Sequence, residues 1–180
     1  MTDVFLEREW PEPLSLGVLH EMANDSLGCF GLHRVDWQES LHSNDKKRLF
    51  CHFRGPDAES VRIALRSLDT DMRIHWPGTV HDAADVSEEE ILGANVVVHR
   101  SFDDPVALED LQALEDANIQ CLETHRVRFM RTFFSTDRLR MACLYAAPDA
   151  ESVRIAQRQA TMPFDSVWAF RRLSPDMLQA

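Results

Sequence analysis

Histidine and cysteine side chains recur at matched places in this 180-residue chain. His33 and His125 are 92 positions apart, and so are Cys51 and Cys143. Imidazole and thiolate groups are common ligands of transition metals. These four residues are therefore the candidate ligands for nickel or another divalent transition metal. The alternative is that each histidine is a core residue bonded to a backbone carbonyl and each cysteine is a small buried thiol.

The spacing C-x-x-x-H also occurs twice, as Cys29 with His33 and as Cys121 with His125. On a helix, residues four apart would share a face. We expect each pair instead to straddle the end of a helix and the start of a strand. Four strand residues span about 13 Å, which is too far for one ion, so we expect Cys29 to pack a turn.

Matched arginine and aromatic residues offer a second chemistry. The candidate ligand-binding residues are Arg8, Arg100, Trp37, Phe129 and Tyr145. The guanidinium groups can bind a carboxylate, and the aromatic rings can line a cavity for an organic ligand. The alternative is that the arginines pair with nearby carboxylates in solvent. The chain has no H-E-x-x-H motif or glycine-rich phosphate loop, so enzyme activity is left open.

An internal duplication carries all of these residues. Residues 4–76 align with 96–168 without a gap, and 24 of these 73 pairs are identical. The nonapeptide PDAESVRIA stands at 56–64 and again at 148–156. It has the features of a helix start, with Pro at the first helical position and acidic residues in the first turn. Neither Arg62 nor Ile63 belongs to its apolar stripe, so their repetition reflects either inheritance or an outer contact surface.

Each repeat is expected to contain four strands and two helices. In the first repeat the expected strands are 4–8, 32–41, 48–54 and 72–76, with helices beginning at Pro13 and Pro56. This order, β-α-β-β-α-β, is that of a ferredoxin-like unit. If the register of the middle hairpin is regular, His33, Trp37 and Cys51 share one face of the sheet.

The fold class is therefore α+β, with two ferredoxin-like units in tandem. The expected boundaries are 1–78 for the first repeat, 79–95 for an acidic linker and 96–180 for the second repeat. A ferredoxin-like sheet has helices on one face only, and the other face needs a cover if it is apolar. We therefore expect the two sheets to meet face to face as an intramolecular, pseudo-dimeric α+β barrel. A homodimer of the tandem chain is a further expectation.

Charge and hydropathy limit the partners. The net charge is −11 and the isoelectric point is near 5.1, which disfavours binding to nucleic acid. We expect no membrane association, because no apolar stretch approaches the roughly 20 residues that span a bilayer. The first residues lack the pattern of a signal peptide, so we expect a cytoplasmic protein.

Each repeat resembles a small ferredoxin-like domain family of largely unknown function, one studied member of which binds nickel. The resemblance lies in the opening VFLEREW-P and in the hairpin from His33 to Arg54 with its W-x-x-S, followed by the PDAESVR helix. The second repeat departs from it, with Phe129-x-x-Thr132 in place of Trp37-x-x-Ser40. The resemblance implies a ferredoxin-like fold, barrel-forming pairs and nickel binding.

Two functions follow from the sequence. One is a cytoplasmic metal-binding protein for nickel handling or sensing, with the four histidine and cysteine candidates as ligands. The alternative is a cofactor-free α+β barrel enzyme or a binder of small organic ligands, with the arginine and aromatic candidates at the site. A third hypothesis, a structural or regulatory partner, would use the outer helix face at Ile63 and Ile155.

Overall fold

The computed structural model describes residues 1–66 and 74–178, which form two compact units. The first unit comprises Met1–Gly78 with the residues from Arg171 onward, and the second comprises Thr79–Phe170. The second unit therefore ends before the expected boundary at residue 180. The segment after Arg171 returns to the first unit, where Arg172 forms an ion pair with Glu39.

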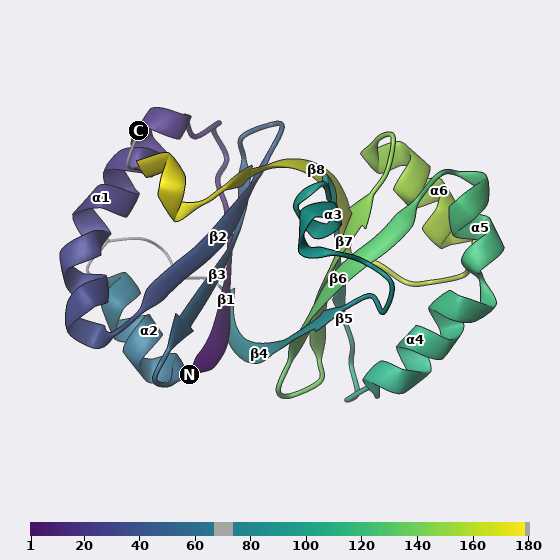
Figure 1. The fold of residues 1–180 in the computed structure, drawn as a ribbon, viewed down its shortest axis with the longest axis horizontal. Coiled ribbons are helices and arrows are strands. Elements are labelled where there is room, and N and C mark those ends of the chain that lie inside the picture. Colours follow the sequence, from purple (N-terminus) through teal and green to yellow (C-terminus); the bar gives the residue numbers. More distant parts are fainter. Residues whose placement is uncertain (67–73, 179–180) are drawn as a thin grey trace. The chain divides into compact units, whose positions relative to one another are not determined.

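The first unit is an antiparallel sheet with helices on one face (Figure 1). Its strand order is β4-β1-β3-β2, and the last residues of β8 lie beside β2. Of the predicted last strand 72–76, residues 72 and 73 lie outside the described residues. Its elements are β1 (Thr2–Glu9), α1 (Leu16–His33), β2 (Asp36–Ser43), β3 (Arg48–Gly55), α2 (Ala58–Arg66) and β4 (Ile74–Asp82), with η1 (Pro175–Leu178) after β8.

The second unit repeats this order as β8-β5-β7-β6. Its elements are α3 (Glu88–Leu92), β5 (Val96–Ser101), α4 (Leu108–Ala117), α5 (Ile119–Thr124), β6 (Arg128–Ser135), β7 (Arg140–Ala146), α6 (Ala150–Gln159) and β8 (Ser166–Leu173). The α+β class and the ferredoxin-like order of both repeats are confirmed. The expected α+β barrel would require a particular arrangement of the two units, and it stays a prediction.

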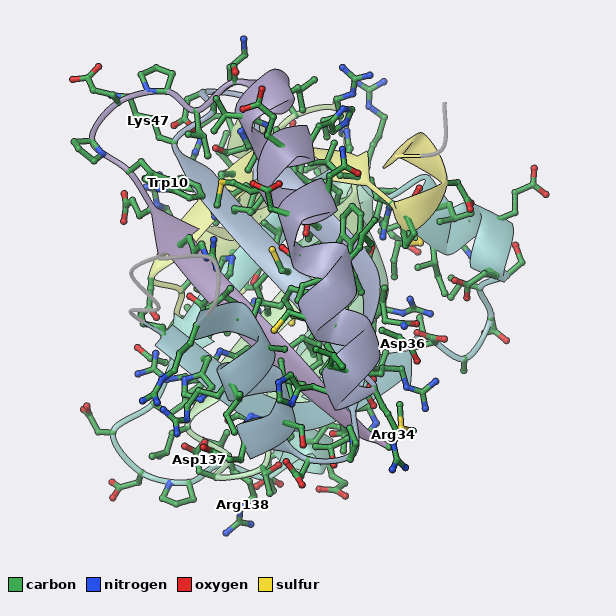
Figure 2. The ribbon with its side chains drawn as sticks, turned by 90° about the vertical axis from the view of Figure 1, so that its left-hand side faces the viewer. Trp10, Arg34, Asp36, Lys47, Asp137 and Arg138 are labelled. Atoms are coloured by element: carbon green, nitrogen blue, oxygen red, sulfur yellow. The ribbon has the colours of Figure 1, made fainter. Side chains whose placement is uncertain are left out.

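Helix α1 is longer than the sequence pattern suggested. It continues to His33, and Arg34 ends it in the left-handed conformation with φ of 53°. Phe30 holds the last turn against the sheet through an edge contact with Phe53, with ring centroids 5.6 Å apart. Strand β2 consequently begins at Asp36, so the prediction that His33 lies on a strand beside Trp37 is wrong. Figure 2 shows α1 with Arg34 and Asp36 near its C-terminal end.

A β-bulge sets the face of the middle hairpin. Trp37 is opposite Phe53, whereas Ser40 is opposite Cys51, because the register shifts between Trp37 and Glu39. The shift turns Ser40 to the helix-covered face that Trp37 and Cys51 also occupy. The predicted common face for Trp37 and Cys51 is thus confirmed. The motif W-x-x-S spans the bulge and places its Trp and Ser side chains on the same face of the sheet.

Repeated polar residues close the two hairpins. The hydroxyl of Ser43 donates to Asp45 at 2.5 Å and accepts from the amide of Arg48 at 2.9 Å. Ser135 donates to Asp137 at 2.6 Å in the second unit. The repetition of S-x-D-x-x-R is therefore explained by local turn chemistry.

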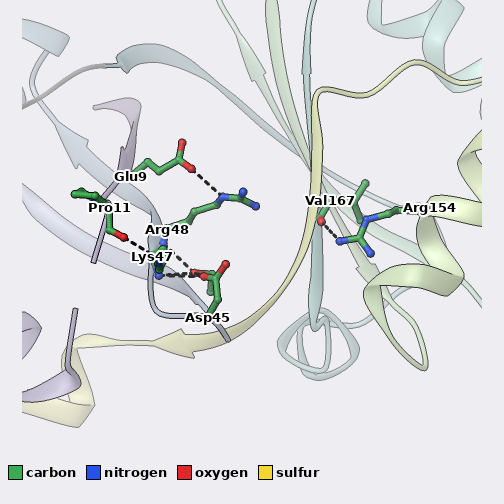
Figure 3. Close-up of polar contacts among 8 residues, drawn as sticks. Glu9, Pro11, Asp45, Lys47, Arg48, Arg154 and Val167 are labelled. Carbon is green, nitrogen blue, oxygen red and sulfur yellow. Dashed lines mark hydrogen bonds and ion pairs between the residues drawn. The ribbon is translucent and has the colours of Figure 1, made fainter. Parts of the chain in front are cut away.

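The first hairpin also holds the segment that joins β1 to α1. Lys47 donates from Nζ to the carbonyl of Pro11 at 2.7 Å, and Arg48 forms an ion pair with Glu9 at 3.4 Å (Figure 3). The amide of Trp10 donates to the carbonyl of Lys47 at 2.8 Å. These contacts fix the point at which the chain leaves the sheet and enters α1.

The repeated nonapeptide begins its helix later than predicted. Asp57 and Asp149 are the capping residues, each accepting a backbone N–H at 2.7 Å from the serine three positions later. The helix interior therefore starts at Ala58, and Pro56 precedes the cap. Asp at this position satisfies an otherwise unpaired helix amide.

The repeated arginine of the nonapeptide has an intrahelical role. Arg62 pairs with Glu59, and Arg154 pairs with Glu151 at 2.9 Å. Arg154 also donates to the carbonyl of Val167 at 2.7 Å, which joins α6 to β8 (Figure 3).

The expected acidic linker is anchored to the second unit. Strand β4 continues to Asp82, and the predicted helical turn in SEEEIL is confirmed as α3. Arg131 of β6 binds Asp82 at 2.5 Å and Glu88 at 3.1 Å, while Arg128 binds Glu90 at 2.6 Å. The acidic composition of this segment therefore matches two arginines on β6. No helix in the described part of the chain is long and apolar enough to cross a bilayer.

Candidate functional site

A cavity of about 60 Å³ lies in the first unit between α1 and the sheet. Its walls are mainly apolar, and three polar side chains reach it from the sheet: Arg8, Ser40 and Cys51. Three half-buried residues of α1 form its outer side: His20, Met22 and Ala23. The aliphatic and aromatic lining is completed by Leu6, Leu19, Phe30, Trp37, Leu49, Phe53, Leu65 and others.

A short hydrogen-bonded chain crosses the sheet side of this cavity. The indole Nε1 of Trp37 donates to Ser40 Oγ at 2.9 Å, and Ser40 Oγ donates to Cys51 Sγ at 2.9 Å. The bulge in β2 allows these hydrogen bonds, because it puts Ser40 on the same face of the sheet as Trp37 and Cys51. Burial raises the pKa of Cys51, so its thiol is protonated at neutral pH. Cys51 is therefore a neutral wall residue.

Arg8 brings the positive charge to the cavity. It stands on the helix-covered face of β1 opposite Leu49, and only 8% of the residue is exposed. Burial lowers the pKa of Arg8, because the surrounding apolar atoms disfavour its charge.

The site in the second unit that corresponds to this cavity is almost completely occupied by side chains. Its cavity measures about 10 Å³. Arg100, the counterpart of Arg8, donates to Gln157 Oε1 at 2.6 Å, to Cys143 Sγ at 3.2 Å and to the carbonyl of Pro163 at 2.9 Å. These internal acceptors satisfy the guanidinium.

A second polar pair lies beside Arg100. The hydroxyl of Tyr145 donates to Glu115 Oε1 at 2.7 Å, and Tyr145 is fully buried. Burial opposes the charge of Arg100, but its neighbours Tyr145, Cys143 and Glu115 hold its pKa above the usual value. The shift is opposite to that of Arg8.

The predicted ligand-binding residues therefore separate by unit. Arg8 and Trp37 line the open cavity of the first unit. Arg100 and Tyr145 are engaged by internal partners, and Phe129 packs edge-on against Tyr145 with centroids 5.8 Å apart. The sequence interpretation missed two aligned pairs of residues that distinguish the cavity of the first unit from the equivalent site of the second. These pairs are Ala23 with Glu115 and Leu65 with Gln157. Comparison of the aligned repeats could have found them, because each pair exchanges an apolar for a polar side chain.

The predicted metal ligands are not gathered in one place within a unit. His33 is the half-buried last residue of α1 and does not line the cavity that Cys51 borders. His125 caps α5 and lies 2.9 Å from Gln159 Oε1 through Nε2. Cys143 is buried against Arg100. Over residues 1–66 and 74–178, no group of three or more histidine, cysteine or carboxylate side chains is arranged to hold one ion.

The C-x-x-x-H pairs have a different geometry from the one expected. Cys29 and His33 both belong to α1, and Cys121 lies in α5 one turn before His125. The argument that a strand separates them by about 13 Å is therefore wrong, because the helix extends through the whole motif. Residues four apart on a helix are neighbours on its surface. Each pair supplies two donors, so a nickel site built on it would need further ligands.

Family comparison identifies both repeats. Residues 5–70 and 96–169 each match the model described as nickel responsive protein SCO4226-like, so the chain belongs to the SCO4226-like family. The two matched segments correspond to the duplicated repeats. No match to a curated protein was found.

Solved structures show similar folds at low identity. SCO4226 from Streptomyces coelicolor A3(2) is 13% identical, with a TM-score of 0.38, and the match covers 47% of this chain and 99% of that one. TA0507, provisionally assigned as a chlorite dismutase, is 11% identical with a TM-score of 0.53 over 98% of this chain and 96% of that one. A heme-binding protein from Thermus thermophilus is 8% identical, with a TM-score of 0.49 over 99% of this chain and 93% of that one. The likeness to TA0507 supports the α+β fold.

Proposed function

We propose that this protein binds a small organic ligand in the cavity of its first unit. The observation that carries the proposal is the difference in volume between about 60 Å³ in the first unit and about 10 Å³ in the second. One water needs about 10–15 Å³, so the first cavity admits roughly four to six non-hydrogen atoms and the second about one.

The composition of the lining supports an organic occupant. Ligand sites are mostly apolar, with a few polar groups that converge on one point. Leu19, Leu49 and Phe53 supply apolar walls, while Arg8 and Ser40 supply polar atoms. A site with this lining holds the apolar part of a ligand by burial and orients its polar end.

Ligand binding is tested by filling the cavity. Ala23→Leu places a larger side chain on the cavity wall, and Val18→Leu is the matched control because Val18 is exposed on the same helix. Isothermal titration with a panel of small organic molecules should give one site per chain in the parent and the control. The Ala23→Leu variant should lose at least tenfold in affinity. Equal affinity in all three proteins would contradict the cavity as the site.

Nickel binding is the second candidate function. It is supported by the family, which is described as nickel responsive, and by the two helical C-x-x-x-H pairs. The predicted ligands His33, His125, Cys51 and Cys143 belong to this proposal. Among the described residues no three histidine, cysteine or carboxylate side chains are arranged to hold one ion, so each pair would need a further ligand to hold nickel.

A further inference from the structure

The sheet side of the first-unit cavity combines apolar side chains with one hydrogen-bonded pair. Ser40 of β2 is opposite Cys51 of β3, and both residues line the cavity. Leu49 and Phe53 lie on either side of Cys51 along β3, and Leu19 faces them from α1. Most of the surface that a bound molecule would touch is therefore apolar, so its affinity would come mainly from burial of apolar surface.

The hydroxyl group of Ser40 determines which polar group of a ligand can bond to it. A serine hydroxyl has one hydrogen to donate and two lone pairs that accept. Ser40 donates its hydrogen to Cys51 Sγ at 2.9 Å, and Trp37 Nε1 donates to Ser40 Oγ at 2.9 Å. These two bonds use the hydrogen and one lone pair. A ligand group that bonds to the second lone pair must therefore supply the hydrogen itself.

The thiol of Cys51 shows how burial at this wall acts on a negative charge. Burial raises the pKa of Cys51, and this effect exceeds the opposing effect of the positive charge on Arg8. The thiol therefore stays neutral at neutral pH although a guanidinium lines the same cavity. A carboxylate ligand at this wall would meet the same desolvation cost. An ammonium ligand would meet that cost and also repulsion from Arg8, so an uncharged ligand is favoured.

We propose that the first-unit cavity binds a short, uncharged alcohol whose hydroxyl group donates a hydrogen bond to Ser40 Oγ. Its hydrocarbon part packs against Leu19, Leu49 and Phe53. This inference rests on the proposed ligand-binding function and specifies its ligand class. The cavity of about 60 Å³ limits the ligand to roughly four to six non-hydrogen atoms, which is the size of a butanol.

The test compares ligands of similar size on the full chain: 1-butanol, its isomer diethyl ether, butyrate and butylammonium. In an NMR titration of ¹⁵N-labelled protein at pH 7, 1-butanol should shift the amides of Leu19 and Leu49. Diethyl ether cannot donate a hydrogen bond and should bind roughly threefold more weakly. The two ions should bind roughly tenfold more weakly, because their charge is desolvated.

Two outcomes of this series separate the alcohol inference from the proposed ligand-binding function. If diethyl ether, butyrate or butylammonium binds the cavity as tightly as 1-butanol, the alcohol inference is overturned and the ligand cavity stands. If none of these molecules binds, and no other member of the wider panel does, both are overturned.

Ser40→Ala removes the proposed acceptor and keeps the apolar walls. It should abolish the preference for 1-butanol over diethyl ether and leave the affinity for the ether within about twofold. Thr132→Val is the matched control, because Thr132 is the aligned residue of the second unit and contacts Cys143 at 3.3 Å. The control should retain the preference. An unchanged preference in Ser40→Ala would contradict the hydrogen bond to Ser40.

Folding of the variant is checked separately, because Ser40→Ala also removes the bonds to Trp37 and Cys51. A cooperative thermal transition shows that the variant is folded. If it is not, the ligand series on the parent chain decides the proposal without any substitution. Ala23→Leu gives a further check, since filling the cavity should weaken 1-butanol roughly tenfold. Unchanged 1-butanol affinity in Ala23→Leu would place the alcohol outside the cavity and overturn the inference.

Discussion

Arg100 donates to the side-chain oxygen of Gln157 at 2.6 Å, across 57 positions of sequence. The matching residues of the first repeat are Arg8 and Leu65, which cannot form this bond. The same fold therefore has polar side chains packed against the arginine in the second unit and a cavity beside the equivalent arginine in the first. The strand order is the same in both units, whereas α1 of the first unit corresponds to two helices, α4 and α5, in the second. At the arginine itself the two units differ in side chains, with Leu65 in place of Gln157.

Gln157→Leu should destabilise the protein by about 1–3 kcal/mol, because a buried charged donor loses its acceptor. Urea unfolding followed by circular dichroism measures the change. Gln120→Leu, at an exposed position of α5, is the control and should change stability by less than about 0.5 kcal/mol. Equal losses in the two variants would show that the Arg100 bond does not stabilise the second unit.

Ser40→Ala should cost about 1–3 kcal/mol, because it removes the acceptor of the Trp37 indole and the donor to Cys51. Thr132→Val is the matched change in the second unit, where only the contact with Cys143 at 3.3 Å is lost. We expect the smaller effect there. Chemical denaturation of both variants checks the order, and the reverse order would contradict the role given to the bulge.

Arg131→Met should loosen the segment that enters the second unit, because Arg131 binds both Asp82 and Glu88 and its side chain is only 13% exposed. The expected loss is about 1–3 kcal/mol. Arg128→Met, at a 51% exposed side chain, should cost below about 1 kcal/mol. Amide hydrogen exchange in α3 measures the loosening. Unchanged protection in Arg131→Met would refute the anchoring role.

Acid should weaken the capping of α3. Hydrogen bonds from the backbone and side chain of Ser87 and from Arg128 lower the pKa of Glu90 to about 2, from a usual value of 4.5. A lowered carboxyl pKa stabilises the folded state above pH 4.5, and that contribution is lost as the pH falls through about 2. The protection of the α3 amides, measured relative to their intrinsic exchange rates at each pH, should therefore fall across this window in the parent. Glu90→Gln should remove this dependence, and an unchanged profile would contradict it.

Nickel binding is tested by titration of untagged protein with nickel followed by calorimetry. His33→Ala with His125→Ala should lower the affinity at least tenfold if these histidines are ligands. His81→Ala is the control, because His81 is exposed and bonds locally to Thr79 at 2.7 Å. Unchanged affinity in the double variant would remove both histidines from the proposed ligand set.

Local sequence patterns predicted the elements of each unit well. Apolar spacing located the helices, and the aligned repeats predicted the same order of elements in both units. The ends of elements were harder to predict. The extension of α1 through Cys29 and His33 depends on Phe30 packing against Phe53, a contact between distant residues. The return of the chain after Arg171 to the first unit likewise depends on a partner, Glu39, that is remote in sequence.

The ferredoxin-like order and the chemistry of the hairpin turns could be predicted from the sequence, because they depend on residues within a few positions of one another. The duplication was visible when the chain was aligned with itself. The sequence also indicated that Arg8 and Trp37 could bind a ligand. The packed fold was needed to show that Arg8 and Trp37 line a cavity, whereas Arg100 is bonded to Gln157. The difference depends on which helix side chains contact the buried arginine of the first strand in each repeat. Those contacts are determined by how the helices pack on the sheet.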